Sequence, residues 1–209
     1  MRGCCAGNSD IASDIPTQPL PASPGDRRLT AKSWRRQPAS VDQPLPLCNG
    51  ANAGMDRYLY KSDIGIFLDT PDAAILGSLA EKNSFALETS QRDAWLAQIQ
   101  ILKAALRPFR TQGRLYLEYS IPRLGGRIDA VVIIRHVLFI VEFKVGERHF
   151  TAGAIDQVWD YALDMQNFHE PSHNCVIAPV LIATQALTHD ITATLDPAKD
   201  RLFQPIKSN

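Results

Sequence analysis

The stretch that decides the fold is residues 126–144, GRIDAVVIIRHVLFIVEFK, in which two apolar runs are separated by a two-residue break. Each run is rich in Val and Ile, which predicts two neighbouring strands that are covered on both faces of a sheet. Asp129 lies in the first run, and Glu142 and Lys144 lie in the second. A buried charge is costly unless it is paired or binds a metal. These three residues therefore mark a candidate site.

The break between the two runs predicts how the strands pair. If Arg135-His136 forms a two-residue hairpin turn, counting back along the strands places Asp129 directly opposite Glu142. The same count places Arg127 opposite Lys144, on the same face of the sheet. Arg-His is not a favoured turn sequence, so a longer loop is the alternative. Symmetric lengthening would keep this register, whereas a single bulge would break it.

Two opposed carboxylates raise each other's pKa unless a cation lies between them. Oxygen ligands favour Mg²⁺ or Mn²⁺ over zinc. Lys144 would then orient a water molecule or neutralise charge on a phosphate under attack. The alternative is an internal ion pair of Glu142 with Lys144 or Arg127, with Asp129 near a strand end.

The flanking sequence predicts helices before the two strands. Apolar residues at helical spacing in residues 62–79 indicate two short helices that meet at Pro71, with Thr70 as a cap. Thr89 or Ser90 can cap a longer helix, which should end before Pro108.

The remaining elements are strands at 114–121 and 175–183 and a helix at 151–168. Alternation in the first of these strands puts Leu115, Leu117, Tyr119 and Ile121 on one face. The expected fold is α/β (α+β), with the order αβββαβ and a mixed sheet of about four strands flanked by helices.

Composition favours one globular domain with flanking segments. The chain has 209 residues and no formal net charge, so a nucleic-acid surface would have to be local. No apolar run approaches the roughly 20 residues of a membrane span, and the four cysteines lack metal-ligand spacing. We expect a reduced, cytoplasmic protein with no membrane contact.

Residues 1–54 contain half of the 14 prolines and predict a disordered N-terminal extension. Its basic cluster around Trp34 is either a solvated segment or a weak phosphate-binding arm, and Met55 is an alternative start. The domain is expected over residues 55–187, followed by a C-terminal tail, 188–209.

The site residues resemble a known family. Asp129 followed by Glu142-Phe143-Lys144 resembles the PD-(D/E)xK nuclease superfamily. Gln157-Val-Trp-Asp-Tyr161 looks like the Gln-x-x-x-Tyr motif of its RecB-like branch, with both side chains on one helical face. Residues 118–129 and 162–169 are similar to uncharacterised nuclease-like domains found ahead of helicase motors in bacterial proteins. The resemblance covers roughly residues 55–184.

This resemblance implies a restriction-endonuclease-like core that hydrolyses DNA phosphodiester bonds with Mg²⁺ or Mn²⁺, in repair, processing or defence. The implied catalytic residues are Asp129, Glu142, Lys144, Gln157 and Tyr161. Asp129 and Glu142 would bind the metal with a third acid, either Glu88 or Glu118. Glu118 is ranked first because it lies in the strand next to the site.

Three arginines flank the predicted site, Arg123, Arg127 and Arg148, as does His149. They either hold the phosphate backbone of DNA or are ordinary surface charges. The sequence has no Gly-x-x-x-x-Gly-Lys-Ser/Thr loop, so we expect any helicase motor to be a partner encoded nearby. The alternatives to a nuclease are a catalytically silent module that binds nucleic acid or docks a motor, and a truncated fragment of a nuclease-helicase protein.

Overall fold

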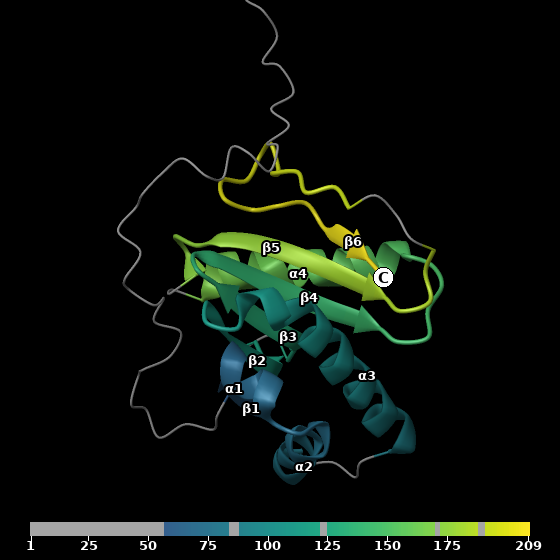
Figure 1. The fold of residues 1–209 in the computed structure, drawn as a ribbon. Helices are drawn as coiled ribbons and strands as arrows, with labels where there is room; N and C mark the ends of the chain where they lie inside the picture. The colour runs from purple at the N-terminus through teal and green to yellow at the C-terminus, as the bar shows by residue number, and fades with distance from the viewer. Residues whose placement is uncertain (1–56, 84–87, 122–124, 170–171, 188–190) are drawn as a thin grey trace, which may run out of the picture. The chain divides into compact units, whose positions relative to one another are not determined.

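The chain forms a mixed α/β fold in which helices flank one sheet (Figure 1). The computed structural model describes residues 57–83, 88–121, 125–169, 172–187 and 191–209. The predicted extension, 1–54, and Arg123 lie outside the described residues. The elements are β1 (Tyr60–Asp63), α1 (Ile64–Asp69), α2 (Asp72–Lys82), α3 (Thr89–Leu106), the 3-10 turn η2 (Arg107–Phe109), β2 (Gly113–Ser120), β3 (Arg127–Ile134), β4 (Val137–Lys144), α4 (Ala152–Phe168), β5 (Val176–Ala183) and β6 (Ile206–Ser208).

The sheet has six strands in the order β1-β2-β3-β4-β5-β6. The first four strands are antiparallel, and β5 and β6 continue in parallel with β4. The predicted helix, three strands, helix and strand are present as α3 to β5. The predicted count of about four strands is wrong, because β1 and β6 are added at the two edges. β6 lies in the predicted tail, so the sheet continues past residue 187.

The central hairpin has the predicted two-residue turn. Ile134 pairs with Val137, and the predicted register holds as far as Ala130 opposite Val141. Arg135 in the turn has a φ of 57°, the left-handed conformation that tight hairpin turns require.

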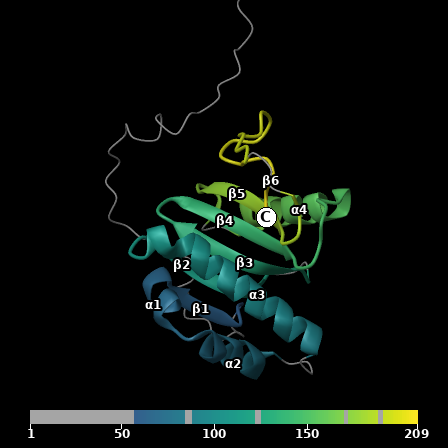
Figure 2. The same cartoon turned by 45° about the vertical axis from the view of Figure 1, so that its right-hand side comes forward.

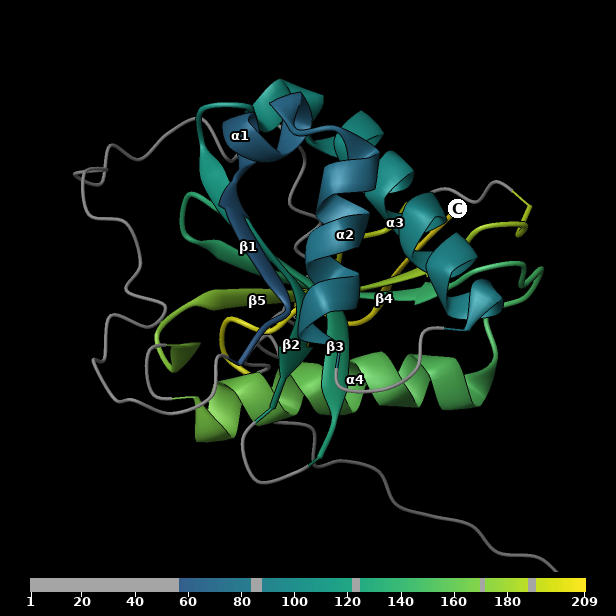
Figure 3. The same ribbon diagram turned by 90° about the horizontal axis from the view of Figure 1, so that it is seen from below.

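The sheet separates two apolar clusters (Figure 3). On one face, Val158, Ala162 and Met165 of α4 pack on side chains from β2 to β5. On the other face, helices α1, α2 and α3 cover side chains from β2, β3 and β4. Figure 2 shows α3 lying across β2 and β3 on this second face. Because both faces are covered, the central strands are continuously apolar.

The alternation of β2 changes at Glu118, where the sequence predicts none. Leu115 and Leu117 belong to the cluster under α3, whereas Tyr119 and Ile121 belong to the cluster under α4. Glu118 has a φ of 55°, which is uncommon outside glycine. The predicted single face is therefore wrong, because one irregular residue turns the following side chains to the other side of the sheet.

Two predicted caps also differ from the structure. The Thr70 hydroxyl donates to the Ile66 carbonyl and so closes the end of α1, while Pro71 occupies the N-cap position of α2. Glu88, rather than Thr89 or Ser90, is the N-cap residue of α3. The helix ends at Leu106, before Pro108, as predicted.

None of the helices among the described residues is both long enough and apolar enough to cross a membrane.

Two glycines give opposite predictions for stability. A Cβ at Gly113 would clash with the Ile133 carbonyl oxygen and would lie 2.9 Å from Cδ1 of Ile64, whereas a Cβ at Gly77 in α2 meets open space. We expect Gly113→Ala to lower the free energy of unfolding by about 3 kcal/mol. Gly77→Ala should raise it by about 0.5–1 kcal/mol. Urea unfolding of both variants checks this, and equal effects would contradict the packing of Gly113.

Candidate active site

The predicted charged residues meet in one pocket at the end of the central strands. Glu118, Asp129, Glu142 and Lys144 line a cavity of about 360 Å³ that α3 covers. They come from three adjacent strands, β2, β3 and β4. The pocket therefore contains the three charged residues singled out in the two apolar runs, together with Glu118.

The site begins where β3 and β4 stop pairing. The ladder ends at Ala130 opposite Val141, and beyond it the Phe143 N–H donates to Asp129 Oδ2 at 2.8 Å. The predicted direct pair of Asp129 with Glu142 is therefore not formed, because the Asp129 side chain accepts the N–H of the neighbouring strand. The two carboxylates still line the same pocket.

Lys144 connects the site to α4. Its Nζ donates to Glu142 Oε1 at 2.9 Å and to Gln157 Oε1 at 2.8 Å. Gln157 Nε2 in turn donates to the Tyr161 hydroxyl at 3.0 Å. The Gln-x-x-x-Tyr pair thus reaches the charged residues through Lys144, from one turn of α4. Fixed on two sides, the Lys144 ammonium group has a defined position beside the carboxylates.

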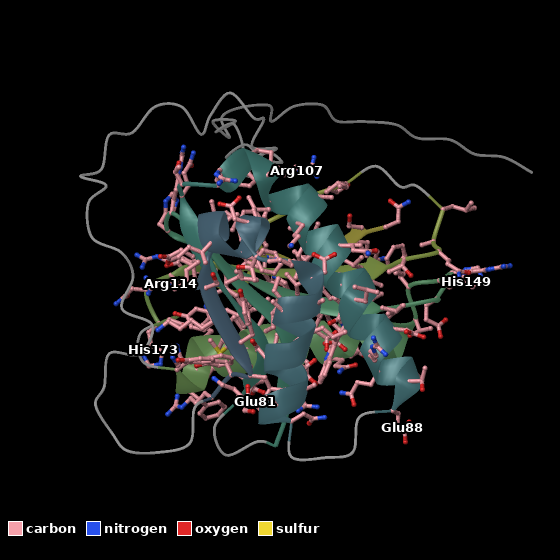
Figure 4. All side chains as sticks on the ribbon, turned by 60° about the horizontal axis from the view of Figure 1, so that its bottom comes forward. Glu81, Glu88, Arg107, Arg114, His149 and His173 are labelled. Carbon is pink, nitrogen blue, oxygen red and sulfur yellow. The ribbon has the colours of Figure 1, made fainter. Side chains whose placement is uncertain are left out.

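Glu118 is the third carboxylate of the pocket. It is buried, and its two oxygens accept from different partners: Trp95 Nε1 at 2.7 Å and Arg127 Nε at 2.7 Å. The alternative third acid, Glu88, is exposed at the N-terminal end of α3 and does not line the pocket (Figure 4). Of the two candidate acids, the structure thus brings only Glu118 to the site.

Three of the four carboxyl groups that line the pocket have a raised pKa. Burial and then the charge of Glu142 raise the pKa of Asp129 to about 7, against the opposing effect of the Phe143 N–H. Burial also raises the pKa of Glu142, although Lys144 opposes this. For Glu118, burial raises the pKa while Trp95 and Arg127 lower it. Burial is the largest cause for each of the three, and neighbouring carboxylates add to it for Asp129 and Glu142.

The donor set fits a divalent cation with oxygen ligands. Glu142 Oε2 is buried and has no hydrogen-bond partner among the described residues. Such a buried carboxylate oxygen is costly to leave unpaired. Asp129 and Glu142 are the residues that would hold Mg²⁺ or Mn²⁺, since hard cations prefer carboxylate oxygen.

In the part of the chain that the structure describes, no three His, Cys, Asp or Glu side chains converge as a ready metal cluster. Glu118, Asp129 and Glu142 instead each have at least one oxygen turned to a protein partner. Glu118 is the most strongly engaged, because both of its oxygens are used. A cation held by Asp129 and Glu142 would therefore need water or substrate oxygen for its other ligands.

The predicted phosphate-binding arginines do not form one group. Arg127 pairs with Glu118 rather than lying opposite Lys144, so its charge is already compensated. Arg148 is exposed in the loop after β4, with Nε 3.4 Å from Gln185 Oε1, and does not line the pocket. Arg123 is outside the described residues. Of the two ion pairs that were the alternative for Glu142, the one with Lys144 is present, whereas Arg127 pairs with Glu118 instead.

Three side chains of α3 belong to the site and were not predicted to. Gln91, Trp95 and Gln98 line the pocket, and Trp95 holds Glu118. The sequence pattern predicted this helix but gave Trp95 no role at the site. The sequence contains one signal, since Gln98 is a polar residue between the apolar positions 95 and 99. In the structure its side chain is buried.

No protein-family model, curated protein or solved structure matches this chain.

The raised pKa of Asp129 predicts how stability depends on pH. Its value of about 7 in the folded chain lies above the roughly 3.9 of an unfolded Asp. The folded chain therefore binds more protons between these pH values, and its free energy of unfolding falls as pH rises through 7. Asp129→Asn removes this loss. We expect the variant to gain stability over the native chain at pH 8, with a smaller gain at pH 5.

Urea unfolding at the two pH values, without divalent cations, measures this gain. Glu88→Gln is the matched control, because it neutralises an exposed carboxylate outside the pocket. Its effect should be the same at both pH values. An Asp129→Asn effect that does not change with pH would show that Asp129 ionises as in an unfolded chain.

Proposed function

We propose that this chain is a metal-dependent nuclease that hydrolyses the phosphodiester bonds of DNA. The observation that carries the proposal is the charge arrangement of the pocket. Asp129 and Glu142 share it, Glu142 Oε2 is buried without a partner among the described residues, and Lys144 is fixed beside them. A cation between carboxylates next to a positioned ammonium group suits an anionic substrate such as a phosphodiester.

The fold supports assignment to the PD-(D/E)xK superfamily with a restriction-endonuclease-like core. The elements from α3 to β5 have the order that this family implies, and Asp129 and Glu142-Phe143-Lys144 lie on the two adjacent strands where the motif requires them. The contact from Lys144 to Gln157, and from there to Tyr161, gives the RecB-like motif a physical role. Gln157 and Tyr161 act as positioning residues for Lys144.

In the proposed reaction, a water oxygen forms a bond to phosphorus as the bond to the leaving sugar oxygen breaks. The products are a phosphate monoester and a hydroxyl group, and the water supplies the proton. Bound Mg²⁺ or Mn²⁺ would supply positive charge at the phosphate and lower the pKa of a bound water. Lys144 donates hydrogen bonds to the developing negative charge or orients the water. Asp129 and Glu142 would hold the cation, and Glu118 adds negative charge near them.

The proposed function extends to a biological process and a partner. Repair, processing or defence of DNA together with a separate helicase would suit a nuclease of the RecB-like branch. The competing function is a catalytically silent module that binds DNA through the same surface. The engagement of Lys144 by Glu142 would suit that module as a purely structural ion pair.

Cleavage assays separate the two functions. We expect labelled DNA to be cut in the presence of Mg²⁺ or Mn²⁺ and not after chelation. Asp129→Asn and Lys144→Met should each reduce the rate by about 100-fold or more, because each removes charge stabilisation at the reacting phosphate. Glu88→Gln is the control and should cut at the native rate. The assay should include single- and double-stranded DNA.

Thermal unfolding with and without Mn²⁺ completes the test. Mn²⁺ should raise the melting temperature of the native chain and of Lys144→Met, but not of Asp129→Asn, since only the last loses a ligand. A native chain that neither cuts DNA nor responds to Mn²⁺, yet binds DNA equally well with Lys144→Met, would establish the binding module instead.

A further inference from the structure

A second pocket lies next to the candidate active site. It has a volume of about 560 Å³ and is formed by the loop after β4 together with the C-terminal segment that leads into β6. Its polar lining comprises Arg148, His149, Thr192, Thr194, Gln204 and Lys207. It shares no lining residue with the candidate active site. Figure 4 shows His149 in the loop at this edge of the molecule.

The second pocket is positively charged. Its lining includes Arg148, His149 and Lys207 and, as far as the described residues go, no carboxylate. Arg148 and Lys207 carry the charge, and neither forms an ion pair with a described Asp or Glu, in contrast to Arg114 with Asp63. Uncompensated cations in a concave surface concentrate anions. The hydroxyl and amide groups beside them are the neutral donors that proteins use for phosphate oxygens.

The sheet register fixes the distance between the two pockets. Leu181 of β5 pairs with Glu142 of β4 on one side and with Lys207 of β6 on the other. In parallel strands, residues so paired point to one face, and each step between strands is roughly 4.8 Å. The backbones at Glu142 and Lys207 are therefore about 10 Å apart. Along the axis of a duplex, that spacing corresponds to a rise of about three nucleotides, at about 3.4 Å each.

The chain also connects the two pockets directly. Glu147 lines the candidate active site and the next residue, Arg148, lines the second pocket. An anionic polymer held at the acidic first site would continue into the basic second site without leaving the surface. The acidic site repels DNA before a cation binds, so attraction for the strand must come from neighbouring cations.

We propose that the second pocket binds the phosphate backbone of the DNA strand that is cut, a few nucleotides from the scissile bond. This inference rests on the proposed nuclease function and adds a subsite to it. Arg148 and Lys207 provide charge, and Thr192, Thr194 and Gln204 provide neutral donors. Binding energy gained there positions the strand for reaction at the first pocket. The C-terminal segment thereby becomes part of the DNA surface.

The test reverses charge in the second pocket without touching the first. Arg148→Glu and Lys207→Glu change exposed side chains, so the urea midpoint should stay unchanged. Arg107→Glu is the matched control. Arg107 is exposed and lies nine residues beyond Gln98 of the first pocket (Figure 4), or about 13 Å along the helix axis. The full chain is used throughout.

Binding is measured first, by fluorescence anisotropy of a labelled single-stranded oligonucleotide, in the Asp129→Asn background so that no cutting occurs. Each reversal should weaken binding about tenfold, and the double variant should lower the salt slope by about 1.4. Arg107→Glu should stay within about twofold of its parent. Reversals that match the Arg107→Glu control would overturn the inference. The inference would also be overturned if the reversals left oligonucleotide binding unchanged and weakened only the binding of inorganic phosphate, measured as a competitor. The pocket would then be a small-anion site.

Cleavage is measured next, in the chain with native Asp129. For a long substrate, the reversals should raise KM and leave kcat unchanged. The same variants should cut a substrate of two nucleotides at the rate of the native chain, because this substrate is too short to reach the second pocket. Equal losses with both substrates would overturn the subsite. If the native chain cuts nothing while the reversals still weaken oligonucleotide binding, the proposed nuclease function fails and a DNA-binding pocket remains.

Discussion

Asp129 and Glu142 place two carboxylates in one pocket at the end of a largely apolar hairpin. Burial, added to by the charge of Glu142, raises the pKa of Asp129 to about 7. A fold does not retain such a pair for stability, since buried charges rarely repay their desolvation. Neighbouring groups partly compensate this charge. The Phe143 N–H donates to Asp129, Lys144 pairs with Glu142, and Arg127 acts indirectly by pairing with Glu118.

Both layers of helices hold the charged groups of the strands in place. On one side, Gln157 of α4 holds Lys144, and Tyr161 holds Gln157. On the other side, Trp95 of α3 holds Glu118. The sheet contributes an irregularity at Glu118, which turns this carboxylate toward α3. Strain and buried charge concentrated at one place are typical of sites kept for function rather than for stability.

Sequence patterns predicted the central hairpin, its turn and α4, because long apolar runs and helical periodicity are strong local signals. Both edge strands were missed. β1 and β6 have four and three residues, and pairing with the sheet defines them more than any pattern of their own. The sequence could not predict the position of Glu118 either, since the Trp95 side chain that donates to it lies 23 residues away, on a helix. Arg127 was expected opposite Lys144. It pairs instead with Glu118 of β2, because β3 and β4 stop pairing before they reach Arg127 and Lys144.

We propose that Asp129 and Glu142 bind a divalent cation in place of the proton that burial and their mutual repulsion retain. Titration calorimetry with Mn²⁺ in buffers of different ionisation enthalpy measures both events together. Because the pKa of Asp129 is about 7, binding at pH 7 should release roughly half a proton, and the release should vanish near pH 9. Asp129→Asn should abolish binding. Absence of Mn²⁺ binding, or binding without proton release at pH 7, would contradict the account.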